Sequence, residues 1–497
     1  MRRAISQYQP LPPRRASRHD GGLAVDLRSK IATLKPRRIV ISLALIVVAA
    51  CGALIWQLNL PWPSTVPLPH ATQGETPNPS VTLISPGVLS VALEGRNTSP
   101  DGLALSGDGT IVIGATMLPR PVSAGGNDAR PVFLHLTADG RPANPAVTLL
   151  GTVGSLAGLA PARDGTIVAA GFGDTAIARR FLVVRLRSDG VLDPDFGGGA
   201  VLVGLRASLW QGAAARAVAV QRDGRVVVTG SAGFASGPLD QGSYCATARF
   251  NRDGRLDRSF GDSGRVLSLI DGRNCGSTAV LVASDQEILV VGSTGAPSTA
   301  LFRYLPDGTL DRRFGRDGVA EFFDATGRGA ALDALDRVVV VGTKWQSRTD
   351  TQLVIARYDR DGNLDQSFGA SGAVFLHQAP ISQQLWAAAV QPDGKIVAVG
   401  TFGWHSRGRP AKPGERNQIV IVRMDANGTL DRAFVGGGFL LMSSPRYLWG
   451  GSAVVVQQDG KLLILGSLVD EGSDDAEGVV LVRLNPDGTP DANFGAQ

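Results

Sequence analysis

Residues 246–269 read ATARFNRDGRLDRSFGDSGRVLSL, and this stretch is the repeated unit of the chain. An alternating apolar run is followed by Asp-Gly, then Leu-Asp, then Phe-Gly, and finally by a second apolar run. Because Asp-Gly supplies the positive φ angles of a tight hairpin turn, the stretch predicts two antiparallel strands with a structured connection. The turn recurs at six further places, once as Asn-Gly: Asp139-Gly140, Asp189-Gly190, Asp307-Gly308, Asp361-Gly362, Asn427-Gly428 and Asp487-Gly488.

A second hairpin motif lies between successive copies of this unit. Its clearest form is AVAVQRDGRVVVTGS at residues 217–231, and it also occurs seven times. Seven pairs of hairpins make seven four-stranded units with a period of about fifty to sixty residues, which is typical of a propeller or a solenoid. We therefore predict an all-β fold, a seven-bladed β-propeller over residues 81–497.

The two ends of the repeat region complete each other. The last unit stops at Gln497 before its own fourth strand, whereas Val88–Leu93 stands before the first complete unit and resembles a fourth strand. We expect Val88–Leu93 to complete the last blade and close the ring, which would leave no unpaired strand edge between the termini.

Two residues of the repeat have separate predicted structural roles. We expect the phenylalanine of the Phe-Gly step to fill the gap between neighbouring blades: it stands at Phe196, Phe260, Phe314, Phe368, Phe434 and Phe494. The aspartate three residues before it favours an Asx-type turn, in which the carboxylate accepts backbone amides. Calcium binding is the alternative, since DRDGNLD at 359–365 offers several carboxylates, but it lacks the spacing and the terminal Glu of an EF-hand.

The pattern DGxLDxxFGxxG, paired with hairpins such as PDGKIVAVG at 392–400, resembles the delta-60 repeat family of bacterial proteins. The resemblance covers residues 86–497 and implies a β-propeller, and it implies no catalytic residue. The first unit departs from the pattern, because TADGRPANPAV at 137–147 lacks both Leu-Asp and Phe-Gly. Val435 also departs from it, since it follows Phe434 in place of glycine.

Charge is distributed unevenly along the chain. Residues 1–38 contain ten basic and two acidic residues, whereas the remainder contains 39 basic and 42 acidic residues. The positive net charge therefore belongs to the tail, and the balance does not indicate a propeller that binds nucleic acid. The tail is rich in Pro, Arg and Ser, and we expect it to be disordered in the cytoplasm.

Residues 39–58 are predicted to form a single transmembrane helix. The run from Ile39 to Trp56 contains no charged residue and is long enough to cross a bilayer. The basic tail should stay in the cytoplasm by the positive-inside bias, which places the propeller outside it, at the cytoplasmic membrane of a bacterium. Residues 59–80 contain six prolines and read as a semi-rigid linker. The alternative anchor is a lipoprotein acylated at Cys51, because Val48–Cys51 resembles a lipobox.

Five tryptophans mark the face of the propeller that we expect to carry the irregular loops. They are Trp210, Trp345, Trp386, Trp404 and Trp449. One interpretation is that the rings cap the blades and pack against loops; the other is that they form a platform for a sugar, a peptide or a protein partner. The basic loop at 403–417, with Arg407 and Arg409, and the acidic loop at 469–478 favour charge complementarity, or else a polar binding rim.

Cys245 opens a third strand and Cys275 follows the fourth strand of the same predicted blade. Antiparallel pairing should bring them close, so we expect a disulfide if the propeller lies outside the cytoplasm, with two free thiols as the alternative.

Enzyme signatures are poor in this sequence. The five histidines show no metal-ligand spacing, and there is no Gly-x-Ser-x-Gly elbow or phosphate loop. We expect no metal and no cofactor. The sequence favours a non-catalytic binding or scaffolding module for an envelope protein or glycan. The alternative is a glycan hydrolase or lyase that uses carboxylates in the central channel.

Overall fold

The computed structural model describes 15 stretches of the chain, and the expected tail (1–38) and transmembrane helix (39–58) lie outside them. The described residues are 65–67, 79–93, 96–118, 129–175, 178–205, 212–234, 243–270, 274–294, 298–323, 325–347, 350–378, 381–403, 417–444, 447–470 and 477–496. Within these stretches no helix has the length and apolar character needed to cross a membrane.

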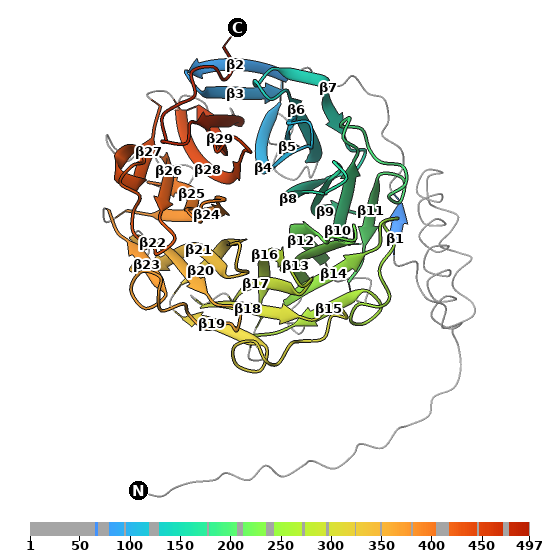
Figure 1. The fold of residues 1–497 in the computed structure, drawn as a ribbon. Coiled ribbons are helices and arrows are strands. Elements are labelled where there is room, and N and C mark those ends of the chain that lie inside the picture. Colours follow the sequence, from blue (N-terminus) through green and yellow to red (C-terminus); the bar gives the residue numbers. More distant parts are fainter. Residues whose placement is uncertain are drawn as a thin grey trace, which may run out of the picture. The chain divides into compact units, whose positions relative to one another are not determined.

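The described chain forms seven antiparallel sheets arranged in a ring, which confirms the all-β, seven-bladed propeller (Figure 1). Each sheet is one blade, and in blades 1 to 6 the four strands of the repeat follow the order of the sequence from the centre of the ring outwards. Apolar residues fill both faces of the middle strands, as expected for sheets packed between two neighbours.

The first four blades have the following strands. Blade 1 contains β4 (Asn97–Leu105), β5 (Ile111–Leu118), β6 (Arg130–Leu136) and β7 (Pro142–Leu149). Blade 2 contains β8 (Gly154–Pro161), β9 (Ile167–Asp174), β10 (Arg179–Leu186) and β11 (Ala200–Val203). Blade 3 contains β12 (Gly212–Val220), β13 (Val226–Phe234), β14 (Tyr244–Phe250) and β15 (Arg265–Ser268). Blade 4 contains β16 (Gly276–Val282), β17 (Ile288–Thr294), β18 (Ser298–Tyr304) and β19 (Val319–Phe323).

Three further blades complete the ring. Blade 5 contains β20 (Thr326–Leu332), β21 (Val338–Trp345), β22 (Thr351–Tyr358) and β23 (Ala373–Leu376). Blade 6 contains β24 (Gln383–Val390), β25 (Ile396–Phe402), β26 (Gln418–Met424) and, after the short 3-10 turn η2 (Val435–Gly438), β27 (Phe439–Met442). Blade 7 contains β28 (Tyr447–Val456), β29 (Leu462–Asp470), β30 (Glu477–Leu484), β3 (Val88–Leu93) and β2 (Pro79–Ser85).

Blade 7 combines strands from both ends of the repeat region. β3 pairs antiparallel with β30, with Ser90 opposite Val480, and β2 adds a fifth strand outside β3 (Figure 1). The side chains of Val88, Leu89 and Val91 are at most 1% exposed, so the joining strand is part of the core.

A short segment inside the expected linker also forms a strand. β1 (Thr65–Pro67) pairs antiparallel with β11 and makes blade 2 five-stranded. The outer strand of a blade presents unpaired N–H and C=O groups, and an extended proline-rich segment can satisfy them. The linker therefore does not extend over the whole of 59–80.

The hydrophobic core is divided into seven clusters, one between each pair of neighbouring blades. The phenylalanines of the Phe-Gly step are at most 2% exposed and lie in six of these clusters. The cluster between blades 1 and 2 contains none of them. The predicted role of these residues as inter-blade packing is confirmed at the other six joints.

Candidate functional site

The propeller has two faces with different chemistry. Turns between first and second strands and between third and fourth strands lie on one side of the ring, which we call the turn face. The opposite side, the loop face, carries the connections between second and third strands and between blades. This division follows from the alternating strand directions within each blade.

On the turn face, an arginine at the end of the third strand joins its blade to the next one. In blade 3, Nε of Arg249 donates to Oδ2 of Asp257 at 2.7 Å, and its guanidinium carbon lies 4.6 Å from the ring centroid of Phe260. Another nitrogen of Arg249 donates to the carbonyl oxygen of Pro306 in blade 4. The backbone N–H of Gly261 donates to the carbonyl of Asp307, 2.7 Å away.

Five other arginines repeat this arrangement with the aspartate of their own repeat and a carbonyl of the next blade. They are Arg185, Arg303, Arg357, Arg423 and Arg483. Sequence reasoning missed these arginines, although a basic residue four positions before Asp-Gly or Asn-Gly stands in six of the seven repeats. Because all six are paired, this face has a structural role.

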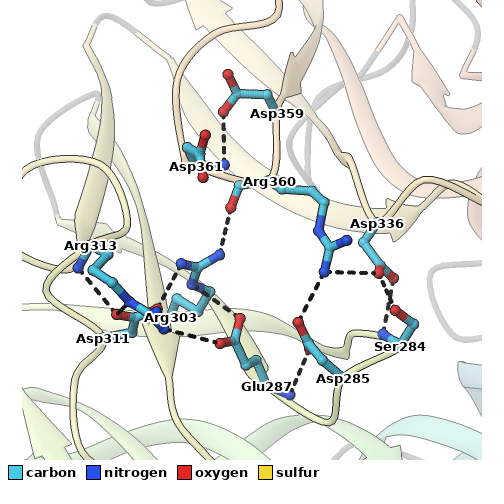
Figure 2. Close-up of polar contacts among 10 residues, drawn as sticks. All are labelled: Ser284, Asp285, Glu287, Arg303, Asp311, Arg313, Asp336, Asp359, Arg360 and Asp361. Carbon is cyan, nitrogen blue, oxygen red and sulfur yellow. Dashed lines mark hydrogen bonds and ion pairs between the residues drawn. The ribbon is translucent and has the colours of Figure 1, made fainter.

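Figure 2 shows the joint between blades 4 and 5, where the charge network is most extended. Arg303 contacts both Asp311 (2.6 Å) and Glu287 (3.3 Å), and it donates to the backbone carbonyl of Arg360 in blade 5, 2.5 Å away. Arg360 in turn lies 3.0 Å from Asp285 of blade 4. The hydrogen bond from Arg313 lowers the pKa of Asp311 to about 2, so this carboxylate stays ionised in the joint.

In the six blades that have it, the aspartate of the repeat forms the predicted Asx-type turn. In blade 3, Oδ1 of Asp257 accepts the backbone N–H of Ser259 at 3.1 Å, while Oδ2 accepts from Arg249. In the stretch considered for calcium, the carboxylate of Asp359 accepts the backbone N–H groups of Asp361 and Asn363. No group of three acidic, histidine or cysteine side chains in the described stretches is arranged to hold a metal ion.

The joint between blades 1 and 2 is built differently. His135 stands at the position of the arginine, and Ala143 and Ala146 stand at those of the aspartate and the phenylalanine. His135 is 1% exposed, and its Nε2 lies 3.2 Å from Oγ1 of Thr148, which donates to the carbonyl of Gly190 in blade 2. Burial lowers the pKa of His135 to about 4, so its ring is neutral at pH 7.

The innermost strands carry a second recurring feature, a β-bulge at the same position in all seven blades. The seven innermost strands, β4, β8, β12, β16, β20, β24 and β28, face the centre of the ring in Figure 1. The pairing register shifts in the middle of each of them, which leaves one residue of the strand unpaired there, and β12 has a second shift at its start. These bulge residues are Asp101, Ala157, Arg216, Thr278, Arg328, Trp386 and Ser452.

Charged residues are rare on the innermost strands and all lie at bulges. Asp101, Arg216 and Arg328 are the three charged residues in these seven strands. Arg216 is exposed to solvent, and Arg328 and Asp101 are partly buried. A bulge re-aims its side chain, so these three charged side chains point differently from their neighbours on the strand.

Arg328 lies in a distinctive environment. Its guanidinium carbon is 5.1 Å from the ring centroid of Trp386 in the next blade, a cation–π contact. Its Nε is buried and has no hydrogen-bond partner within the described stretches. Burial lowers the pKa of Arg328, and the positive charge of Arg216, two blades away, lowers it further. Both residues stand at bulges of innermost strands, Arg216 on β12 and Arg328 on β20, and these strands face the centre of the ring (Figure 1).

Asp101 has hydrogen-bond partners in its own blade and in the next one. Its carboxyl accepts the hydroxyl of Thr116 and the backbone N–H of Leu156, and the Thr116 hydroxyl lies 2.9 Å from Oγ of Ser155. Burial raises the pKa of Asp101 to about 8.

The structure separates the five tryptophans named from the sequence. Trp345 is 42% exposed at the end of β21, whereas Trp449 is 3% exposed and packs in the core between blades 6 and 7. Trp386 and Trp449 lie within the innermost strands β24 and β28. Four of the named residues lie outside the described stretches: Trp210, Trp404, Arg407 and Arg409. Cys51 also lies outside them.

A disulfide joins Cys245 and Cys275 in blade 3. Cys245 is the second residue of β14, and its neighbour across the sheet is Ser268, the last residue of β15. Cys275 follows a short connection from that strand, so the bond ties the outer half of blade 3 to the start of blade 4.

Comparisons with known proteins agree with this architecture. A family model described as a domain of unknown function (DUF5122) β-propeller matches residues 162–196, 221–260, 283–314, 336–368, 391–434 and 457–494. The chain is a β-propeller repeat protein. The matched segments begin in blade 2, and the unmatched blade 1 is the one in which His135, Ala143 and Ala146 replace the joint residues. No curated protein matches this repeat protein.

Several solved structures are distantly similar to this repeat protein. A streptogramin B lyase has 10% sequence identity and a TM-score of 0.42, with 79% of this chain and 96% of that chain covered. The polysaccharide lyase Uly1 has 10% identity and a TM-score of 0.43, with 78% and 90% covered. Sqt1 from Chaetomium thermophilum has 14% identity and a TM-score of 0.39, with 78% and 97% covered.

Proposed function

We propose that this β-propeller repeat protein is a single-pass protein of the bacterial cytoplasmic membrane, and that its propeller binds an envelope glycan or protein outside the cytoplasm without catalysing a reaction. The basic tail at 1–38, the uncharged run within 39–58 and the prolines that follow it support this topology. Acylation at Cys51 is the alternative anchor. The DGxLDxxFGxxG pattern supports assigning the repeats to the delta-60 type.

The observation that carries the binding function is the pair of unmatched cations at the ring axis. The six joint arginines each contact an aspartate, whereas neither Arg216 nor Arg328 has an ion pair within the described stretches. The partly buried charge of Arg328, without an ion pair in the described stretches, destabilises the fold, and binding sites commonly contain such groups. The exposed Arg216 adds a second positive charge on an innermost strand. We therefore assign these two residues to ligand binding.

The same wall offers little for hydrolysis or for lyase chemistry. Glycoside hydrolysis commonly needs two carboxyl groups on either side of the scissile bond, and the innermost strands contain one acidic residue, Asp101. The observation that favours the alternative, a glycan hydrolase or lyase, is the raised pKa of Asp101. A carboxyl group with a pKa of about 8 is protonated at pH 7, as a general acid requires.

Capture from an envelope extract tests the proposed function. The full-length chain, purified in detergent and immobilised, is incubated with the extract, alongside the Asp101→Asn variant. We expect both proteins to retain the same component, and we expect that component to be recovered intact. Failure of both to retain anything would contradict binding. Conversion of the component by the natural chain but not by Asp101→Asn would favour the enzyme.

A fusion tests the topology separately. Alkaline phosphatase is active only outside the cytoplasm, so we expect a fusion after Gln497 to be active. An inactive enzyme in a stably expressed fusion would place the propeller in the cytoplasm and contradict the proposed location.

A further inference from the structure

The sparse charges at the ring axis limit what a ligand there can be. The charged residues of the innermost strands are Asp101, Arg216 and Arg328. Because the pKa of Asp101 is about 8, this carboxyl group is mostly neutral at pH 7, and the two arginines give these strands a net positive charge. Positive groups converging on one region raise the local concentration of anions. The ligand of this wall should therefore carry negative charge.

Arg328 has unused hydrogen-bonding capacity as well as unused charge. A guanidinium offers five N–H donors, and no hydrogen bond or ion pair is formed by Arg328 within the described stretches. The side chain of Arg216 also forms no hydrogen bond or ion pair within the described stretches, and it is exposed to solvent. Carboxylates match the fork of a guanidinium with two parallel hydrogen bonds.

Trp386 provides an apolar surface beside this positive charge. Its ring lies against Arg328 in the neighbouring blade and is only partly buried. Aromatic rings combine a large apolar area with low conformational entropy, and this suits them to the C–H face of a sugar ring. An acidic peptide would use the arginines equally well but would leave the tryptophan without a specific role.

We propose that Arg216, Arg328 and Trp386 form a site for a carboxylate-bearing sugar, a uronate unit of a glycan, at the ring axis. This assignment rests on the proposed binding function and specifies its ligand class. The carboxylate contacts the two guanidinium groups, and the sugar ring packs on Trp386.

Isothermal titration calorimetry with the full-length chain in detergent tests the site. The probes are an oligogalacturonate, a neutral glucose oligomer of equal length and poly-glutamate. We expect the oligogalacturonate alone to bind, with affinity that falls as salt is added. Arg216→Ala and Arg328→Ala should each weaken it about tenfold or more, as expected for loss of a charge-assisted bidentate contact. Arg312→Ala is the matched control, since Arg312 is exposed on the turn face, and it should leave affinity unchanged.

Arg216→Ala keeps the test decisive if Arg328→Ala fails to fold, because Arg216 is exposed and its side chain forms no hydrogen bond or ion pair within the described stretches. The proposal would be overturned by absent uronate binding, by equal binding to the alanine variants, or by poly-glutamate binding as tightly. If the envelope extract still yields a component that Arg216→Ala fails to capture, the proposed function survives and the ligand class alone is wrong. If the natural chain captures nothing, both are wrong.

Discussion

The ring of Phe260 in blade 3 lies directly against Gly308 in blade 4: a Cβ atom added to Gly308 would stand 2.9 Å from Cδ2 of that phenylalanine. Gly308 has φ +85°, so the same glycine also forms the hairpin turn. Five more pairs repeat the contact around the ring: Phe196 with Gly254, Phe314 with Gly362, Phe368 with Gly428, Phe434 with Gly488 and Phe494 with Gly140. The glycine of the repeat thus serves both the turn and the joint.

Removing one joint phenylalanine should destabilise the whole ring. We expect Phe260→Ala to lower the free energy of unfolding by about 3 to 5 kcal/mol, the usual cost of emptying a fully buried aromatic site. Urea denaturation measures this change in the free energy of unfolding. Phe375→Ala is the control, because Phe375 is 42% exposed. If both variants lowered the free energy of unfolding by similar amounts, packing at the joint would not be a main source of stability.

Removing a joint arginine should take the closest ion-pair partner from a buried carboxylate: Asp257 lies 2.7 Å from Arg249 and 3.3 Å from the more exposed Arg225. Arg249 is 2% exposed, and we expect Arg249→Ala to cost about 3 to 5 kcal/mol, as for other broken buried ion pairs. Lysine should not restore the stability, since it cannot reach Asp257 and Pro306 together with one planar group. Arg255→Ala, at a side chain that is 83% exposed, should change little in the same denaturation series. A full rescue by lysine would contradict the bridging role.

Asp101 and His135 should give the stability of the propeller an unusual dependence on pH. The pKa of Asp101 is about 8 instead of the ordinary 3.8, so the folded state holds this proton more tightly than the unfolded state. The contribution of Asp101 to the free energy of unfolding is complete below pH 4 and is lost as the pH rises to 8. The pKa of His135 is about 4 instead of 6.5, so its contribution is complete above pH 6.5 and is lost as the pH falls to 4.

Between pH 6.5 and pH 8, Asp101 is the one of these two groups that still titrates. We expect stability to fall over this interval by at most about 1.4 kcal/mol per pH unit. Asp101→Asn should abolish the decline, because the amide carries no proton to lose, whereas Asp317→Asn at an exposed turn should preserve it. Thermal unfolding followed at several pH values provides the test. An identical slope in Asp101→Asn would show that the carboxyl group ionises normally.

Deleting residues 86–95 should open the seventh blade. The deletion removes Val88, Leu89, Val91 and Leu93, four side chains that are at most 2% exposed, and it exposes the edge of β30. At about 1.5 to 3 kcal/mol for each buried side chain, we expect a loss of roughly 6 to 12 kcal/mol, together with rapid proteolysis. A chain that lacks residues 2–30 of the tail is the control. Unchanged melting and protease resistance would refute the closure.

The sequence predicts most of the fold because single residues of the repeat indicate where a turn forms and which side chain packs between blades. Asp253 and Gly254 specify a turn, and Phe260 is a large apolar residue next to it, so both the strands and the inter-blade packing can be inferred. Arg249 was missed for a physical reason: a charged residue at a strand end normally indicates exposure, and only the three-dimensional ring shows that it is 2% exposed between blades.

The candidate site is less predictable than the fold. A bulge shifts the alternation of inward and outward residues by one position, so the pattern around Arg216 in AAARAVAV does not reveal which way the side chain points. Trp345 and Trp449 show the same difficulty, since the first is exposed and the second is buried although both stand near strand ends on the loop face. A single charge inside an apolar run, as at Arg216 and Arg328, is the signal that would have found the site.

Photo-crosslinking from position 386 tests binding at the ring axis in the most direct way. A photoreactive phenylalanine replaces Trp386, and a second chain carries it in place of Leu335, which is 63% exposed on the turn face. Both are irradiated with envelope extract. We predict a uronate-containing adduct from position 386 and none from position 335. Equal adducts from both positions, or an adduct from position 335 alone, would contradict a ligand site at the ring axis.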